Sequence, residues 1–192
     1  MQRAATMSQA FILLQRQSKE SQAGRLMPPC LRIPSSDMIE TMSLISKILP
    51  LENVILDAES SSKKRVFERV GIVFENTQQI ARSQVFDSLF TREKLGSTGL
   101  GQGVAIPHGR IKGLRDAIAA FVKTQTPIPF DAPDGQPVNL IFVLLVPERA
   151  TDLHLQLLGE LAQMFSDKSF RARLQASDDP AAIHQMFAEW KA

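Results

Sequence analysis

This chain of 192 residues has only one cysteine, almost equal numbers of positive and negative residues, and no long hydrophobic run. The single cysteine, Cys30, excludes an intramolecular disulfide framework and a zinc site built on cysteine pairs, and it fits a reducing compartment. Lysine and arginine number 22 against 20 aspartate and glutamate residues, and a net charge of +2 argues against a nucleic-acid partner. No apolar run approaches the roughly 20 residues that span a bilayer. We therefore expect no membrane insertion and predict a cytoplasmic protein.

The N-terminal part of the chain differs from the rest. Residues 1–41 are polar, rich in glutamine and serine, and interrupted by prolines. Their one apolar stretch, residues 10–14, is too short to be the core of a signal peptide. We predict a disordered extension over residues 1–41 and one folded domain over residues 42–192. An alternative interpretation is that translation starts at Met42, where the first segment with folded character begins.

Helical and strand-like patterns alternate over the remaining residues. Apolar residues at helical spacing predict a helix after Ser60, with Ile72 on its apolar face, and a second helix capped by Thr77. Two strands are predicted over 117–122 and 138–146, with a loop from Pro127 between them, and the second is apolar enough to be buried on both faces. Helices are expected again over 153–165, near 170–175 and from Pro180. This order predicts an α/β sandwich.

A glycine-rich segment separates the second predicted helix from the first predicted strand. It carries five glycines, at positions 96, 99, 101, 103 and 109. Their spacing matches neither GxGxxG before a helix nor GxxxxGK[ST], so it argues against a nucleotide-binding loop. Taken alone, the glycines are better explained by a flexible loop with turns that need positive φ.

His108 lies in this segment, between Pro107 and Gly109, at the end of the short strand-like residues 104–106. Imidazole can be a neutral nucleophile near pH 7 and still leave afterwards, as reversible phosphoryl transfer requires. A lone histidine in a loop is also often an ordinary surface residue, so spacing leaves both interpretations open. Arg92 and Arg110 are candidate donors to a phosphoryl group.

His154 falls in the first turn of the helix predicted after Asp152. A helix N-terminus favours an anion, and a neutral His154 there could donate a ring N–H to a phosphoryl oxygen. The alternative is a half-buried histidine that packs beside neighbouring leucines. Three widely separated histidines without paired-ligand spacing predict no metal site, and no cofactor is expected.

Four stretches together resemble the nitrogen-regulatory enzyme IIA of the bacterial phosphotransferase system, a relative of the fructose and mannitol enzymes IIA. They are residues 91–101 with Thr-Arg-Glu-Lys-Leu-Gly, residues 103–110 with Gly-Val-Ala-Ile-Pro-His-Gly-Arg, the apolar residues 138–147, and residues 154–158 with His-Leu-Gln-Leu-Leu. The resemblance covers the chain from about Met42 onward. It implies a mixed β-sheet flanked by helices on both faces, the fructose/mannitol enzyme IIA sandwich.

The resemblance also implies roles for individual residues. His108 matches the phosphoacceptor, which accepts on its Nε2 nitrogen, Arg92 matches an arginine that contacts the phosphoryl group, and His154 matches a second active-site histidine. The surrounding loop, through Gly96, Ser97, Thr98 and Gly109, is expected to support the phosphoryl group. Some relatives have a further histidine where Gln156 stands, so no role is expected at that position.

The implied donor is a small HPr-like protein of the nitrogen branch that carries a phosphohistidine. The implied outcome is regulation, according to phosphorylation state, of targets such as sensor kinases or potassium-transport proteins. An alternative is a sugar-transport enzyme IIA that passes the phosphoryl group to an enzyme IIB, and a third hypothesis is a binding module without chemistry. No turnover of a free small substrate is indicated, so classing the chain as an enzyme is a matter of convention.

Overall fold

The computed structural model describes residues 43–149 and 152–191 of the chain. The predicted N-terminal extension and the alternative start at Met42 lie outside these residues. Within them, no helix combines the length and apolarity needed to cross a membrane.

A mixed sheet of six strands forms the centre of the folded unit, and its strand order is β1-β5-β6-β3-β2, with β4 also paired to β6. β5 and β6 are antiparallel, whereas β1 runs parallel to β5, and β3 and β4 run parallel to β6. The strands are β1 (Val54–Ala58), β2 (Gly99–Gly101), β3 (Val104–Ala105), β4 (His108–Ile111), β5 (Ile118–Ile128) and β6 (Val138–Pro147). The predicted mixed sheet is therefore confirmed.

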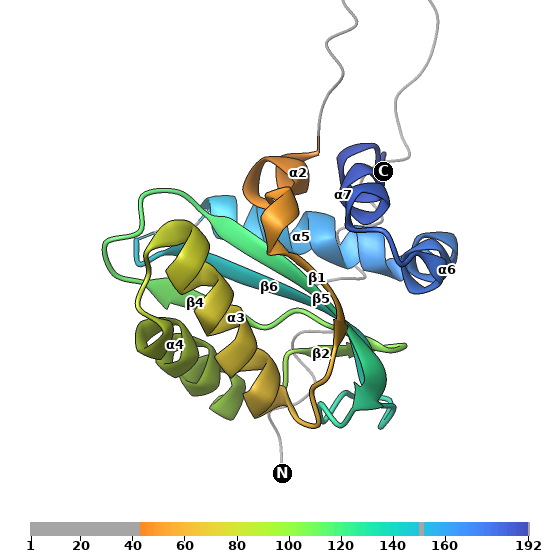
Figure 1. Cartoon of the computed structure of the whole chain (residues 1–192), viewed down its shortest axis with the longest axis horizontal. Helices are drawn as coiled ribbons and strands as arrows, with labels where there is room; N and C mark the ends of the chain where they lie inside the picture. The colour runs from red at the N-terminus through yellow and green to blue at the C-terminus, as the bar shows by residue number, and fades with distance from the viewer. Residues whose placement is uncertain (1–42, 150–151, 192) are drawn as a thin grey trace, which may run out of the picture. The chain divides into compact units, whose positions relative to one another are not determined.

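Helices cover both faces of this sheet, as Figure 1 shows. One face carries α3 (Lys63–Gln78) and α4 (Arg82–Lys94). The other carries a short helix near the start of the folded unit and three helices that follow β6, namely α2 (Leu44–Ile48), α5 (Asp152–Ser166), α6 (Lys168–Ala176) and α7 (Pro180–Ala188). A 3-10 turn, Leu51–Asn53, leads into β1. The predicted arrangement of helices on both faces is confirmed.

The apolar strand β6 requires a layer of helices on each face of the sheet. Its side chains alternate between two buried clusters, with Phe142 and Leu144 on the α5–α7 side and Ile141 and Val143 on the α3–α4 side. A strand whose two faces are both apolar is stable only when both are covered. The near-continuous apolarity of residues 138–146 correctly predicted this central position.

Two details of the predicted helices are wrong. Thr77 does not cap the second helix, because α3 continues to Gln78 and the Thr77 hydroxyl donates to the carbonyl of Val73. Ile72 does not join the apolar face of α3, since it remains 44% exposed while Val70 and Phe74 are buried. A run of three consecutive apolar residues cannot all point inward from a helix of 3.6 residues per turn.

The predicted strands are incomplete. β5 continues to Ile128 and includes Pro127, which was expected to open a loop. The pairing of β5 with β6 shifts register between Lys123 and Ile128, and such an irregularity accommodates a residue without an N–H. β1, β2 and β4 were not predicted, because each strand is too short to show a detectable alternation of apolar and polar residues.

Candidate functional site

His108 is the first residue of β4, next to the buried strand β6. The segment between β3 and β4 is fixed to β6 through Pro107, whose carbonyl oxygen accepts the N–H of Leu144 at 2.9 Å. His108 itself is the register partner of Leu144. The rigid centre of the sheet therefore holds the backbone of the predicted phosphoacceptor, while its imidazole remains half-buried at the surface.

Each ring nitrogen of His108 faces a group that can act only as a hydrogen-bond donor or only as an acceptor. Nδ1 lies 2.9 Å from the carbonyl oxygen of Ile106, which can only accept, so Nδ1 carries the proton. Nε2 lies 3.0 Å from Nε of Arg92, which can only donate, so Nε2 presents its lone pair. The neutral ring is therefore held as the tautomer whose Nε2 is the nucleophilic nitrogen.

The surroundings also favour the neutral ring. Burial lowers the pKa of His108 below its ordinary value of 6.5, and the positive charge of Arg92 lowers it further. The hydrogen bond to Ile106 and the negative charge of Glu93 act in the opposite direction without reversing the shift. Because the net shift is downward, His108 is unprotonated on Nε2 near pH 7.

His154 comes to the same place from the first turn of α5. Its ring centroid lies 5.4 Å from that of His108, with 68° between the ring planes. Burial lowers the pKa of His154, and repulsion from His108 when that ring is protonated, and from Arg110 and Arg92, lowers it further. Its Nε2 atom is buried and forms no hydrogen bond with any described residue. A buried ring nitrogen without a partner is costly, so this atom is ready to bond to a ligand.

A hollow of about 600 Å³ surrounds these side chains. It brings together α4, β4 and the start of α5, which are far apart in sequence. Its lining comprises Asp87, Ser88, Thr91, Arg92, Leu95, His108, Gly109, Arg110 and His154. The predicted residues His108, Arg92, His154 and Gly109 thus share one surface depression.

The other three predicted supporting residues do not line this hollow. Gly96 acts on Arg92, because its carbonyl oxygen accepts from Nη1 of Arg92 at 3.0 Å. Ser97 Oγ donates to the carbonyl of Phe130 at 2.5 Å, and Thr98 Oγ1 donates to Glu93 at 2.6 Å. These hydroxyl groups are therefore engaged in holding the loop.

Gly109 has a steric reason to be glycine. A Cβ atom at this position would collide with the Oγ atom of Ser88 and lie 3.2 Å from its Cβ. Ser88 in turn donates from Oγ to the carbonyl of Arg110 at 2.8 Å. The close approach lets α4 lie against β4, so that Arg92 on the same helix reaches His108.

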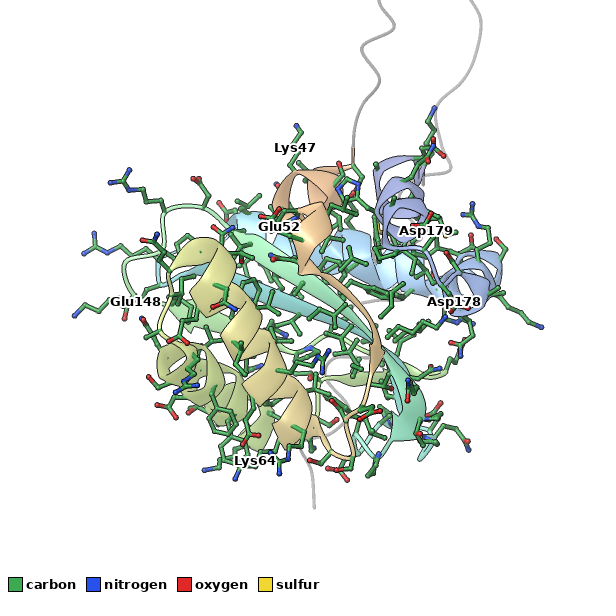
Figure 2. All side chains as sticks on the ribbon, in the orientation of Figure 1. Lys47, Glu52, Lys64, Glu148, Asp178 and Asp179 are labelled. Atoms are coloured by element: carbon green, nitrogen blue, oxygen red, sulfur yellow. The ribbon has the colours of Figure 1, made fainter. Side chains whose placement is uncertain are left out.

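The Arg110 side chain is exposed and lines the hollow. Its Nη1 atom donates to the carbonyl of Glu148 at 3.3 Å, and Figure 2 labels Glu148, just beyond the end of β6. The guanidinium of Arg110 has further donors and contributes positive charge to the hollow. It is a second basic group beside the histidine pair.

Comparison with known proteins identifies the family. Residues 47–190 match the family described as "Phosphoenolpyruvate-dependent sugar phosphotransferase system, EIIA 2". The chain belongs to this EIIA 2 family. The resemblance inferred from the four sequence stretches is confirmed.

Individual relatives place this EIIA 2 protein near the nitrogen-regulatory members. It is 40% identical over 149 residues to the nitrogen regulatory protein of Pseudomonas aeruginosa, a match that covers 77% of this chain and 97% of that protein. The crystal structure of the nitrogen regulatory protein IIA-Ntr from Neisseria meningitidis is 52% identical and has a TM-score of 0.73, covering 76% of this chain and all of that one. The IIA mannitol structure from Escherichia coli, at 20% identity, TM-score 0.62, and coverage of 72% and 98%, shares the fold.

Two residues of this EIIA 2 site were not predicted. Ser88 lies under Gly109, and Glu93 lies buried beside the loop that carries Thr98. A sequence signal existed for Glu93: it continues the four-residue spacing of Val85 and Leu89, which are both buried on α4. An acidic residue that falls on an apolar helical stripe indicates a buried carboxylate with partners.

Proposed function

We propose that this EIIA 2 protein is a regulatory phosphocarrier that accepts a phosphoryl group on Nε2 of His108. The observation that carries the proposal is the paired restraint of one imidazole, with Nδ1 donating to Ile106 and Nε2 facing Arg92. This restraint leaves one nitrogen with a lone pair in a hollow lined by two arginines. A neutral imidazole held in that way is an activated nucleophile for phosphorus.

The proposed donor is the phosphohistidine of an HPr-like protein of the nitrogen branch. The lone pair on Nε2 of His108 forms a new P–N bond as the P–N bond of the donor breaks, and the donor imidazole leaves with that electron pair. His108 keeps the proton on Nδ1, which Ile106 continues to accept. The reaction exchanges one P–N bond for another, so neither water nor an oxidant takes part.

Arg92 and His154 supply the charge stabilisation that such a transfer needs. Arg92 must release Nε2 before the phosphorus can approach, and its guanidinium then pairs with phosphoryl oxygens while Gly96 still holds Nη1. The unpartnered Nε2 of His154 can donate to another oxygen when it carries the proton. The transferred group brings close to two negative charges, which these donors and Arg110 offset.

The surface beside the hollow suits a protein donor. Leu95, which lines the hollow just after the end of α4, is 82% exposed, and Leu155 at the start of α5 is 70% exposed. Leu153, on the other side of His154, is also exposed. Exposed leucines around an open depression are typical of a surface that a partner protein covers for a short time.

We propose the regulatory role because the nitrogen regulatory proteins are the nearer relatives, at 52% and 40% identity against 20% for IIA mannitol. The phosphorylated and unphosphorylated forms would bind targets such as sensor kinases or potassium-transport proteins differently. The alternative is transfer to an enzyme IIB in sugar transport, which the family description favours. A specific loss of growth on fructose or mannitol in a His108→Ala strain would support this alternative.

Intact mass and phosphohistidine mapping at alkaline pH test the carrier function. The full chain is mixed with enzyme I, the HPr-like donor and phosphoenolpyruvate, alongside His108→Ala and the control His184→Ala on α7. We expect one phosphoryl group on wild type and on His184→Ala, and none on His108→Ala. A wild-type protein that gains nothing from an active donor would overturn the proposal and favour the binding module without chemistry.

A further inference from the structure

Glu93 is a buried carboxylate that the proposed phosphoryl transfer does not use. It follows Arg92 on α4, yet its side chain is only 5% exposed and does not line the hollow. Its Oε2 atom accepts from the backbone N–H of Thr98 at 3.0 Å and from the Thr98 hydroxyl at 2.6 Å. Its Oε1 atom accepts from Nζ of Lys63 at 3.0 Å. Full pairing of this kind is what a carboxylate needs in order to remain charged when buried.

The partners of Glu93 lead to the nucleophile. The carbonyl oxygen of Thr98, the residue that Glu93 holds by two bonds, accepts the N–H of Ile106 at 3.0 Å. The carbonyl oxygen of Ile106 accepts Nδ1–H of His108 at 2.9 Å. Two consecutive residues of α4 therefore act on opposite nitrogens of one imidazole: Arg92 directly on Nε2, and Glu93 on Nδ1 through Thr98 and Ile106.

We infer that Glu93 is a positioning residue for His108, which holds the Thr98 backbone so that the Ile106 carbonyl keeps the proton on Nδ1 and leaves Nε2 as the nucleophile. The consequence for phosphoryl transfer rests on the proposed function. The consequence for the imidazole does not, because the position of the proton is a property of the unphosphorylated protein. An experiment can therefore contradict the positioning role of Glu93 without contradicting the proposed phosphocarrier function, and the reverse.

Electrostatics gives Glu93 a second effect on the same ring. Burial and Arg92 lower the pKa of His108, and the negative charge of Glu93 opposes them. The other charged or titratable groups that line the hollow are Asp87 on α4, Arg110 on β4 and His154 on α5. Removing the charge of Glu93 while leaving these groups in place lowers the titration midpoint of His108 further. A residue that only stabilised the fold would not shift this midpoint.

Nitrogen-15 NMR of the histidine rings tests the inference in the full chain. In wild type we expect the His108 pattern of a protonated Nδ1 and a bare Nε2. In Glu93→Ala the two ring-nitrogen shifts should move toward each other as the other tautomer is populated, and phosphoryl acceptance should slow by about tenfold or more through lost orientation. Glu93→Gln keeps an oxygen for Thr98, so it should retain the tautomer and show only the lowered midpoint.

The matched control is Asp131→Asn. Asp131 is the other carboxylate on Lys63, at 2.7 Å, and its side chain is 79% exposed and outside the chain from Glu93 to His108. It should leave the tautomer and the midpoint unchanged. If Glu93→Ala does not fold, Thr98→Val takes its place, since it removes the hydroxyl that donates to Glu93 and should shift the tautomer by a smaller amount.

The outcomes separate the inference from the function. An unchanged tautomer and midpoint in folded Glu93→Ala, or unchanged values in both Glu93→Gln and Thr98→Val, would overturn the positioning role. A tautomer shift in a protein that the donor cannot phosphorylate even as wild type would support Glu93 and overturn the phosphocarrier. A tautomer shift together with slowed acceptance would support both.

Discussion

The guanidinium of Arg92 donates from Nε to Nε2 of His108 across 3.0 Å, and so occupies the lone pair that the proposed transfer needs. The same guanidinium is held by the Gly96 carbonyl through Nη1. Under the proposed transfer Arg92 therefore has two roles: it donates to Nε2 in the free protein, and it would pair with the phosphoryl oxygens during the transfer. Its planar set of donors suits both uses, and a lysine ammonium cannot reproduce that geometry.

Arg92 should be essential for the rate but not for the fold. We expect Arg92→Gln to slow phosphoryl acceptance by about 100-fold, the typical cost of removing one preorganised donor, with Arg92→Lys intermediate. Rapid quench into alkali followed by intact-mass analysis would give the rate. Arg110→Gln is the matched control, because Arg110 contacts Glu148 and not the His108 ring, so its loss should be smaller. An Arg92→Gln protein as fast as wild type would contradict the assigned role.

Acceptance should persist to mildly acidic pH. Burial, followed by Arg92, lowers the pKa of His108 below 6.5, so the reactive neutral ring survives as pH falls through 6.5. We expect the acidic limb of the pH–rate profile to have its midpoint below that of a histidine in a model peptide. NMR titration of the ring measures the same midpoint independently. A midpoint at or above 6.5 would contradict the downward shift that burial and Arg92 are expected to cause.

The same shifts predict how stability depends on pH. For His108 and His154 the folded-state pKa lies below the unfolded value of 6.5, so the unfolded chain binds more protons between the two values. The free energy of unfolding should therefore decrease as pH falls through 6.5 and level off below the folded-state pKa values. Urea denaturation at several pH values measures this slope. Replacing both histidines with alanine should flatten it.

Gly109→Ala should destabilise the contact between α4 and β4. The new Cβ collides with Oγ of Ser88, and overpacking of this kind typically costs about 1 to 3 kcal/mol. Ser88→Ala alone loses its hydrogen bond to Arg110, at about 1 kcal/mol. Because Ser88→Ala also removes the colliding atom, the double variant should lose less than the sum of the single variants in urea denaturation. Strict additivity would contradict the steric explanation.

Lys123 should anchor the end of α6 to the sheet. It lies on β5 with only 8% of its surface exposed, and Nζ donates to the carbonyls of Gln175 and Ser177 at 2.7 and 2.9 Å and to Asp178 at 2.8 Å. Lys123→Met leaves both carbonyls without this donor, and we expect a loss of about 2 to 4 kcal/mol in the free energy of unfolding.

The control for Lys123 is Asp178→Asn at the turn between α6 and α7, where Figure 2 labels Asp178. The Asp178 side chain is 76% exposed, so loss of its ion pair should cost no more than about 1 kcal/mol. Equal losses in the two variants would place the stabilisation in the exposed ion pair instead of the buried carbonyl contacts.

The local sequence was sufficient to predict elements that contain a long apolar pattern or that begin at a specific capping signal. The apolar run of β6 predicted a strand covered on both faces, and the register of its side chains between two clusters confirms it. Pro180 predicted the start of α7, and in the structure the carboxylate of Asp179 caps this helix by accepting the N–H of Ala181. Such signals work because the interactions they describe join residues within one helical turn or one strand.

The sequence by itself also determined the family and indicated three residues of the candidate site, because Arg92, His108 and His154 occur in short stretches with a distinctive order. The contacts among them were decided by the tertiary structure. α4 must lie against β4, through the space left by Gly109, before Arg92 can reach Nε2 of His108. The route from Glu93 to Nδ1 likewise passes through hydrogen bonds between residues that have no sequence period in common. Which nitrogen holds the proton depends on the distance and direction of groups that only the packed sheet and helices bring together.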